Sequence, residues 1–327
     1  MPHKFISEIN PGETVDDIYM VKSPILRSTS RGDLYIAMYL LDKTGQVNSR
    51  MWQATEAAYK SIPRPGFIHI KGRSELYKNN LQIVVNNFGV IDRSKVNIED
   101  FLPRTEGDIG KMFEEVKQIL SEIKNPQLKK IVDEFLNDKP LMEKFCKAPA
   151  AIKMHHSYLG GLLEHTLTTL KSAKAVLGIY PEVQPDLVLA GLFFHDLGKT
   201  QELNYDMAFE YTDSGQLIGH ITQTIIMLEN EVQNLRKQGE QIEQDIVDAL
   251  EHIILSHHGQ YEFGSPKLPA TPEAFMVSYL DDMDAKLQQV NKAIEDEDEE
   301  SNWTQWNRGL ERRIYRKNPE ITEQGEQ

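Results

Sequence analysis

The sequence lacks the features that mark secreted and membrane-embedded proteins. It has a single cysteine, Cys146, among 327 residues. One cysteine excludes an internal disulfide framework and is typical of a reducing compartment. The longest uninterrupted apolar run, Leu187–Phe194, is eight residues long and far too short to span a membrane. Because no signal-peptide apolar region follows the N-terminal residues, we expect a cytoplasmic protein without a membrane partner.

Positive charge is also in short supply. The chain has 36 Lys and Arg against 50 Asp and Glu, a formal net charge of −14. This balance argues against a protein that coats nucleic acid with its whole surface. The charge is uneven, however: residues 1–95 hold 13 basic and 9 acidic side chains, and the remainder holds 23 and 41. The asymmetry favours a mildly basic binding module joined to an acidic domain, which can still handle phosphates if bound metal ions supply positive charge.

Short alternating segments separated by turn residues predict a β-rich N-terminal module. The expected strands are residues 18–28, 34–41, 47–52, 67–77 and 81–90. Asp42-Lys43-Thr44-Gly45 and Lys78-Asn79-Asn80 are hairpin signals, and a short helical stretch, Thr55–Ser61, precedes the fourth strand. Five strands with an insert before the fourth are typical of a small all-β OB-type barrel, which we assign to residues 1–93.

Such barrels bind single strands through basic grooves and exposed aromatic side chains on which bases stack. The residues of this module that could bind nucleic acid in that way are Tyr35, Tyr39, Trp52, Arg27, Arg50, Lys71, Arg73 and Lys78. The alternative is that Trp52 and at least one tyrosine fill the barrel core. That alternative is favoured for any single residue, and nucleic-acid binding is favoured for the module as a whole.

After a polar stretch, the apolar period becomes helical. Residues 94–150 are predicted to be a linker and connecting helices, with apolar stripes over 109–123 and 128–136. The helical pattern of residues 151–327 predicts an all-α domain. Together with the barrel of residues 1–93, it predicts a multidomain protein. Its expected helices cover residues 159–177, 187–194, 217–235, 242–254 and 272–290. Trp303, Trp306, Leu310 and Ile314, at spacings of 3, 4 and 4, predict a C-terminal helix that docks its tryptophan stripe on the body.

Histidines gather in the helical region, where eight of the ten fall between His155 and His258. Each of the predicted helices of that region carries one near an end; these residues are His165, His195 with Asp196, His220, and His257 with His258. Taken singly, each is typical of a hydrogen-bonded core or surface histidine. Together they indicate a metal cage inside a helical bundle. Burial of Asp196 at the end of an apolar helix costs on the order of several kcal/mol unless the carboxylate is paired or bound to a cation.

A further carboxylate is needed to anchor one metal, and the helix over 272–290 offers Asp281, Asp282 and Asp284. At about 100° per residue, the apolar side chains of this helix centre on one direction. Asp282 and Asp284 each lie roughly 100° from that direction, and Asp281 lies roughly 160° from it. This geometry disfavours Asp281 and leaves the choice between Asp282 and Asp284 undecided.

His165, His195-Asp196 and Asp282, in this order, resemble the H…HD…D pattern of the HD superfamily of metal-dependent phosphohydrolases. In that pattern the final aspartate follows a small apolar run, as Tyr279-Leu280-Asp281-Asp282 does, and the resemblance selects Asp282. The family folds as an all-α domain, which implies the same for residues 151–327.

Two further segments resemble features of that superfamily. His220 and His257-His258 are similar to the extra histidines of dinuclear members. His195-Asp196-Leu197-Gly198-Lys199 is similar to the HDxGK segment, whose lysine contacts substrate phosphate. The resemblance implies that two cations share Asp196 and that Lys199 neutralises a phosphate oxygen, so Asp196 and Lys199 are the candidate catalytic residues. Bound metal can lower the pKa of water to about 7.

An OB-type module ahead of an HD domain is similar to the YhaM-type 3′→5′ exoribonucleases of Gram-positive bacteria, and Leu159–Thr166 is a close match. The resemblance implies hydrolysis of single-stranded RNA from its 3′ end, with DNA as an alternative substrate. Histidine and carboxylate ligands without cysteine favour two Mn²⁺ ions, with Co²⁺, Fe²⁺, Zn²⁺ and Mg²⁺ as alternatives. The competing hypotheses are a phosphohydrolase of small nucleotides and a nucleic-acid-binding protein without turnover. The sequence leaves the number of subunits open, and a homo-oligomer is compatible with it.

Overall fold

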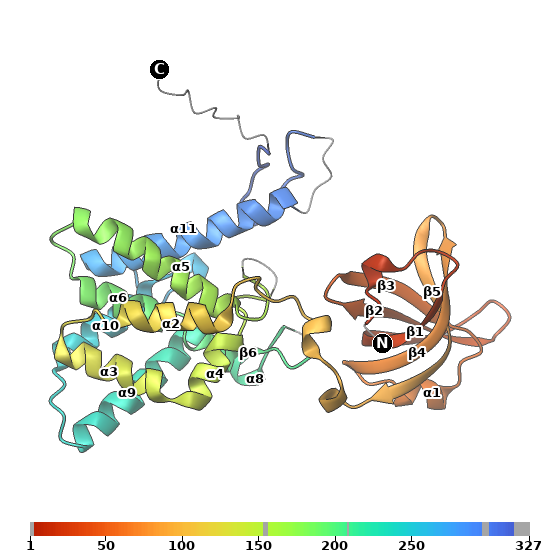
Figure 1. The fold of residues 1–327 in the computed structure, drawn as a ribbon, viewed down its shortest axis with the longest axis horizontal. Coiled ribbons are helices and arrows are strands. Elements are labelled where there is room, and N and C mark those ends of the chain that lie inside the picture. The colour runs from red at the N-terminus through yellow and green to blue at the C-terminus, as the bar shows by residue number, and fades with distance from the viewer. Residues whose placement is uncertain (1–2, 153–155, 208, 296–300, 317–327) are drawn as a thin grey trace. The chain divides into compact units, whose positions relative to one another are not determined.

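The computed structural model describes residues 3–152, 156–207, 209–295 and 301–316. The chain divides into two compact units: residues 1–106 with 204–210, and residues 107–203 with those from 211 onward. Figure 1 shows mainly strands in the first unit and mainly helices in the second. The boundary therefore falls after Glu106, beyond the predicted end of the barrel module at residue 93. The predicted connecting helices belong to the helical unit and do not form a separate linker.

The first unit is a closed five-stranded barrel in the order β1-β2-β3-β5-β4. Its strands are β1 (Thr14–Ser28), β2 (Leu34–Asp42), β3 (Gly45–Met51), β4 (Gly66–Tyr77) and β5 (Asn80–Ile91). All neighbouring strands pair antiparallel except β3 and β5, which are parallel and close the barrel. The insert between β3 and β4 is α1 (Glu56–Ser61), whose first turn is capped by the Thr55 side chain. The predicted OB-type barrel is confirmed.

Alternation along β2 separates the core of the barrel from its surface. Ile36, Met38 and Leu40 point inward and are at most 3 % exposed. Tyr39 points outward and is 44 % exposed. The polypeptide after β5 remains part of this unit, because Phe101 is buried against Phe67 with ring centroids 5.0 Å apart. Burial of Phe101 explains why the unit continues to Glu106.

The second unit is helical, apart from short turns and the two-residue strands β6 (Leu203–Asn204) and β7 (Glu210–Tyr211) at its junction with the first. Its α-helices are α2 (Ile109–Leu120), α3 (Pro126–Asn137), α4 (Lys139–Lys147), α5 (Gly161–Val176), α6 (Pro185–Phe194), α7 (Lys199–Glu202), α8 (Asp213–Ile218), α9 (His220–Lys237), α10 (Gln244–Ser256) and α11 (Pro272–Glu295). The predicted continuous helix over 217–235 is interrupted at Gly219, whose φ of +77° is incompatible with a right-handed helix. His220 is therefore the first residue of α9. None of the described helices is long and apolar enough to cross a membrane.

Helix α6 is the packing centre of this unit and contacts α5, α10 and α11 (Figure 1). It is apolar on all sides, and every residue from Val188 to Phe194 is buried. Gly191 allows close approach, since a Cβ there would lie 2.7 Å from Ile253 of α10. The burial of α6 places its C-terminal end, with His195 and Asp196, in the interior of the helical unit.

The predicted C-terminal helix is wrong. Residues 301–316 form two isolated antiparallel bridges, Trp303 with Tyr315 and Asn307 with Arg312. The Asn307 side chain accepts a hydrogen bond from the backbone N–H of Leu310 at 3.0 Å and stabilises the turn between them. Trp303 and Trp306 remain 50 % and 62 % exposed, so they do not dock as a buried stripe. A 3-4-4 apolar spacing interrupted by Asn307 and Gly309, which favour turns, was insufficient to specify a helix.

Candidate metal centre

Five histidines from four helices converge beside Asp196. His165 lies in the second turn of α5, His195 caps the C-terminus of α6, and His220 begins α9. His257 caps the C-terminus of α10 and His258 follows it. The structure thus brings together all five histidines that the sequence singled out. Their donor atoms form two groups, one on each side of the Asp196 carboxylate.

The first group, here called the His165 site, consists of His165, His195, Asp196 and Asp281. The Nε2 atoms of His165 and His195 lie 3.1 Å apart. The Oδ2 atom of Asp196 lies 3.6 Å from His165 Nε2 and 3.5 Å from His195 Nε2. Asp281 Oδ1 is 3.2 Å from His165 Nε2. Two ligands bonded to one ion at about 2.1 Å are roughly 3.0–3.5 Å apart, so these spacings match a metal position.

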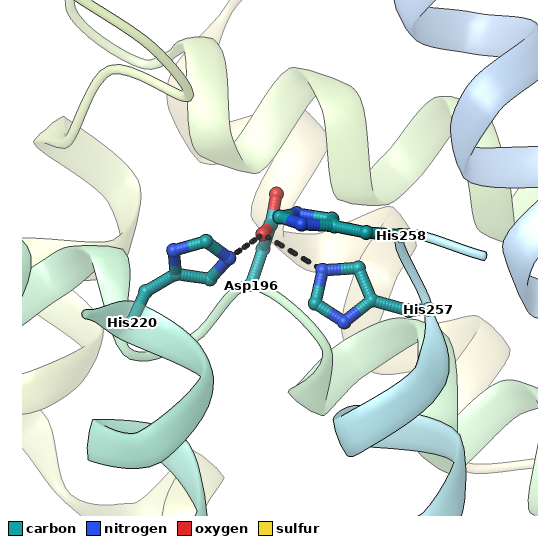
Figure 2. A group of neighbouring side chains, drawn as sticks. All are labelled: Asp196, His220, His257 and His258. Carbon is teal, nitrogen blue, oxygen red and sulfur yellow. Dashed lines mark ion pairs between the residues drawn. The ribbon is translucent and has the colours of Figure 1, made fainter. Parts of the chain in front are cut away.

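The second group, the His220 site, consists of Asp196, His220, His257 and His258. Figure 2 shows the imidazoles of His220 and His257 directed at the Asp196 carboxylate. The Oδ1 atom of Asp196 lies 3.4 Å from His220 Nε2 and 3.7 Å from His257 Nε2. The His258 ring lies 4.3 Å from that of His257, centroid to centroid. This group also has a donor set that suits a divalent cation, and its Asp196 carboxylate belongs to the His165 site as well.

The donor atoms fit a cation because the protein leaves several of them unsatisfied. Asp196 Oδ1, His220 Nε2 and His257 Nε2 are buried and have no hydrogen-bond partner among the described residues. Buried polar atoms without partners are rare and costly. The Nδ1 atoms of His195 and His257 instead donate to backbone carbonyls, Leu192 O at 2.8 Å and Ile254 O at 2.7 Å. Because a carbonyl oxygen can only accept, Nδ1 carries the proton and Nε2 keeps its lone pair for a metal.

Lys199 is also part of the centre. Its buried Nζ lies 2.7 Å from Asp196 Oδ2. Burial would raise the pKa of Asp196, but Lys199 and the neighbouring imidazoles hold that pKa well below its usual range. Burial would lower the pKa of Lys199, and Asp196 raises it above its ordinary value. Gly198 allows this turn to pack on α9, since a Cβ there would lie 2.1 Å from the carbonyl oxygen of His220.

The histidines respond differently to this environment. Burial lowers the pKa of His195 to about 4 and, with the neighbouring His257 and His220, the pKa of His258 to about 3. Both imidazoles are therefore neutral at pH 7, the form in which histidine binds metal. Burial would also lower the pKa of His165, but its bonds to Asp281 and Asp284 raise it to about 10. The carboxylates around His165 thus favour a positive charge at this position, whether a proton or a cation supplies it.

The prediction that Asp282 is the inward carboxylate is wrong, and so is the argument against Asp281. The Asp282 side chain is 48 % exposed and forms an ion pair with Lys286 at 2.6 Å. The Asp281 side chain is 14 % exposed and faces His165 and His195. Asp284, the other alternative, is buried, and its Oδ2 atom lies 2.6 Å from the Nδ1 atom of His165. Asp281 of α11 is therefore the second carboxylate of the His165 site, beside Asp196.

The error arose from the direction assigned to the apolar face of α11. Four of its large hydrophobic residues lie on the exposed side; they are Phe275, Tyr279, Met283 and Leu287, each at least 43 % exposed. The inward stripe includes the buried residues Ala274, Val277 and Asp284 and the partly buried Asp281, at spacings of 3, 4 and 3, and Leu280 is buried beside it. Helical period alone could have identified this stripe if residue size had been given less weight.

The barrel presents a second candidate site, an aromatic cluster formed by Tyr35, Arg50, Trp52 and Tyr77. The Tyr35 and Trp52 rings lie 5.0 Å apart. The Arg50 guanidinium lies 5.9, 5.6 and 5.0 Å from the ring centroids of Tyr35, Trp52 and Tyr77, respectively. Trp52 and Tyr77 are 42 % and 44 % exposed, which contradicts the alternative that Trp52 fills the core. The sequence interpretation missed Tyr77, although it directly precedes Lys78 at the hairpin.

The other predicted nucleic-acid-binding residues lie on the barrel surface. Lys78 is exposed, and its Nζ lies 5.7 Å from the Tyr77 ring, beside the aromatic cluster. Arg27 on β1 is exposed and is paired in register with Tyr35. Lys71 and Arg73 are exposed on β4, where Lys71 forms an ion pair with Asp16 at 3.3 Å. That ion pair reduces the positive charge that Lys71 offers to a phosphate.

Comparison with known proteins places this geometry in a family. The HD domain family matches residues 162–286, the segment that contains every residue of the His165 site and the His220 site. The chain is thus an HD-domain protein with a five-stranded barrel ahead of that domain. It is 34 % identical to the 3′-5′ exoribonuclease YhaM of Bacillus subtilis (strain 168) over 285 residues, which cover 87 % of this chain and 88 % of the relative. The YhaM protein of Bacillus velezensis is also 34 % identical, with the same coverage. The chain belongs to the YhaM family.

Among solved structures, the barrel is similar to the second OB-fold domain of replication protein A from Methanococcus maripaludis. That match has 22 % sequence identity, covers 28 % of this chain and 95 % of that domain, and has a TM-score of 0.21.

Proposed function

We propose that the protein is a metal-dependent 3′→5′ exoribonuclease that hydrolyses single-stranded RNA. Membership of the YhaM family supports this activity. The position of the Asp196 carboxylate is the strongest structural support for this activity. Its Oδ2 atom faces His165 and His195, and its Oδ1 atom faces His220 and His257. A carboxylate placed in this way suits a two-metal phosphodiesterase.

Two divalent ions are the proposed cofactors, one in the His165 site and one in the His220 site. Imidazole and carboxylate donors without a thiolate favour Mn²⁺ among the metals that accept such ligands. When bound, a pair of cations supplies an activated water and stabilises the negative charge that develops on the phosphate. The histidines would hold the two ions through Nε2, and each oxygen of the Asp196 carboxylate would serve one of the two sites.

The two remaining residues of the centre, Asp281 and Lys199, set the balance of charge around the proposed cations and the substrate phosphate. Asp281 adds a second carboxylate to the His165 site only, so this site carries more negative charge than the His220 site. Lys199, beside Asp196, is positioned to neutralise a phosphate oxygen of the substrate once cations compensate the carboxylates. The burial of the cage strengthens each of these interactions relative to water.

The barrel is the proposed substrate-binding module. Its aromatic cluster offers exposed rings for bases and a guanidinium for cation–π contacts or phosphate. Base stacking tolerates any sequence, which suits an exonuclease that must accept successive nucleotides. DNA strands offer the same rings and phosphates and remain an alternative substrate.

The experiment that tests this function uses metal-loaded protein with single-stranded RNA labelled at the 5′ end, and free nucleotides in parallel. We expect a ladder of fragments that shorten from the 3′ end, with release of mononucleotides. RNA carrying a 3′-terminal phosphorothioate linkage should be degraded more slowly. Turnover of free nucleotides alone would contradict the proposal, and RNA binding without cleavage by protein of full metal content would leave only a binding function.

A further inference from the structure

The five imidazoles of the cage are all held through Nδ1, but their partners differ. Three donate to backbone carbonyls: His195 to Leu192, His257 to Ile254, and His258 to Phe263 at 2.8 Å. The other two contact carboxylates: His165 meets Asp284, and His220 meets Glu202. Each metal position therefore contains one carboxylate-backed histidine.

Asp284 is fixed on both sides. Its Oδ2 atom lies 2.6 Å from His165 Nδ1 and 2.9 Å from His156 Nε2. The other ring nitrogen of His156, Nδ1, lies 2.7 Å from the hydroxyl of Tyr158. Asp284 and His156 are 5 % and 2 % exposed. A buried carboxylate held between two imidazoles cannot rotate freely, so the ring plane of His165 is fixed with Nε2 toward the His165 site.

Glu202 is fixed by a different route. It is the last residue of α7, the short helix that begins at Lys199, and it is 8 % exposed. Its Oε1 atom accepts the backbone N–H of His220 at 3.0 Å and lies 3.2 Å from the Nδ1 atom of the same residue. These two contacts join the carboxylate to both the backbone and the ring of His220. Gly215 packs closely on Glu202, since a Cβ there would lie 2.3 Å from the Glu202 carbonyl oxygen.

We propose that Asp284 and Glu202 are positioning residues, one for each metal position, that orient the histidine and increase the basicity of its Nε2 atom. Neither carboxylate supplies a ligand atom in this account. A carboxylate is a stronger acceptor for an imidazole N–H than a carbonyl, so the backed histidine binds a cation more tightly. This inference rests on the proposed function only in assuming that the cage holds two cations.

The test is a count of metal ions bound by full-length protein that has first been stripped with a chelator. Mn²⁺ is titrated, and free Mn²⁺ is followed by electron paramagnetic resonance, for the wild type and for Asp284→Ala, Asp284→Asn and Glu202→Ala. In each alanine variant we expect one ion to bind as in the wild type and the other about 10–100-fold more weakly. Asp284→Asn keeps an oxygen acceptor without the charge and should lose less affinity than Asp284→Ala.

The double variant, Asp284→Ala with Glu202→Ala, shows whether two positions are involved. If each carboxylate supports a different ion, both ions bind weakly in the double variant. Retention of one tightly bound ion would assign both carboxylates to the same position and overturn the proposal.

Matched controls separate positioning from a loss of folding. Asp282→Asn alters an exposed aspartate of the same helix as Asp284, and Glu231→Gln alters a glutamate of α9, the helix that carries His220. Both should bind two ions like the wild type. The metal-free variants should keep the circular dichroism spectrum of the wild type and unfold in one cooperative transition, which shows that they fold. Wild-type affinity in the variants, or equal weakening of both ions in each single variant, would overturn the proposal.

The outcome is independent of RNA cleavage. A wild-type protein that binds two ions but releases no nucleotides would refute the proposed function and leave the positioning roles intact. A wild-type protein that degrades RNA while Asp284→Ala binds both ions normally would refute the positioning role alone.

Discussion

The two units of this protein present their candidate functional residues in opposite ways. In the barrel, Trp52 and Tyr77 are more than 40 % exposed; both lie beside the Arg50 guanidinium, and Trp52 also contacts Tyr35. In the helical unit, His165, His195 and His257 are at most 1 % exposed, and backbone or carboxylate partners fix each ring. Surface rings can adapt to varied bases, whereas a metal cage requires preorganised donors. Substrate recognition and chemistry should therefore respond to different substitutions.

The largest effect is expected at Asp196, the residue shared by the two proposed metal positions. Asp196→Ala removes the carboxylate that lies between them, and loss of about 4 kcal/mol of charge stabilisation corresponds to roughly 10³-fold in rate. We expect RNA turnover to fall by at least that factor while RNA binding, followed by fluorescence anisotropy, stays within about twofold of the wild type. Turnover retained with undiminished metal content would remove Asp196 from the mechanism.

A second pair of variants tests the geometry of α11 directly. Asp281→Asn removes charge from the His165 site, and we expect metal affinity and turnover to fall by at least about 10–100-fold, the range seen for partners of metal ligands. Asp282→Asn changes an exposed residue paired only with Lys286 and should leave both unchanged. Steady-state kinetics with metal titration measures the two variants side by side. A reversed order would restore the assignment that the sequence pattern suggested.

Substitutions in the barrel should weaken RNA binding and leave the hydrolytic chemistry unchanged. Trp52→Ala removes an exposed ring of the aromatic cluster, and the loss of about 1–3 kcal/mol of base stacking predicts RNA binding roughly 5- to 150-fold weaker. Hydrolysis of a small phosphodiester such as bis(p-nitrophenyl) phosphate should be unaffected. Tyr180→Ala, which alters a similarly exposed ring in the helical unit, serves as the control and should bind RNA normally. Equal weakening in both variants would contradict a binding role for the aromatic cluster.

The smallest effect concerns where the barrel unit ends. Phe101 is 4 % exposed and packs on Phe67, so a fragment of residues 1–106 should be more stable than one of residues 1–92. Burial of one phenylalanine predicts a difference of about 1.5–3 kcal/mol in the free energy of unfolding. Urea unfolding of the two fragments, followed by circular dichroism, gives this difference. Equal stabilities would return the boundary to the end of β5.

Much of this architecture could be predicted from local patterns. Alternation such as Ile36, Met38 and Leu40 identified the strands of the barrel, and turn residues located both hairpins. The five histidines were found by residue type and by their places at helix ends. These signals are local and strong because each depends on a few neighbouring residues.

The remaining features depend on tertiary packing. The orientation of α11 was misjudged because its largest apolar residues, including Phe275 and Tyr279, face outward while Ala274 and Val277 pack inward. The contacts of Glu202 with His220 and of Asp284 with His165 could not be predicted from local patterns, because the partners are 18 and 119 residues apart in the sequence. The tryptophans near the C-terminus followed a helical spacing, but the turn at Asn307 prevailed. In each case a contact distant in sequence, or a turn, overrode the periodic pattern.

In the proposed centre, one carboxylate, Asp196, holds two cations between two groups of imidazoles. Anomalous diffraction from crystals equilibrated with Mn²⁺, recorded at the manganese absorption edge, would locate these cations. We expect two peaks, one between Asp196 Oδ2, His165 and His195, and the other between Asp196 Oδ1, His220 and His257. The absence of any peak beside Asp196, or a single peak contacted by only one of its oxygens, would contradict it.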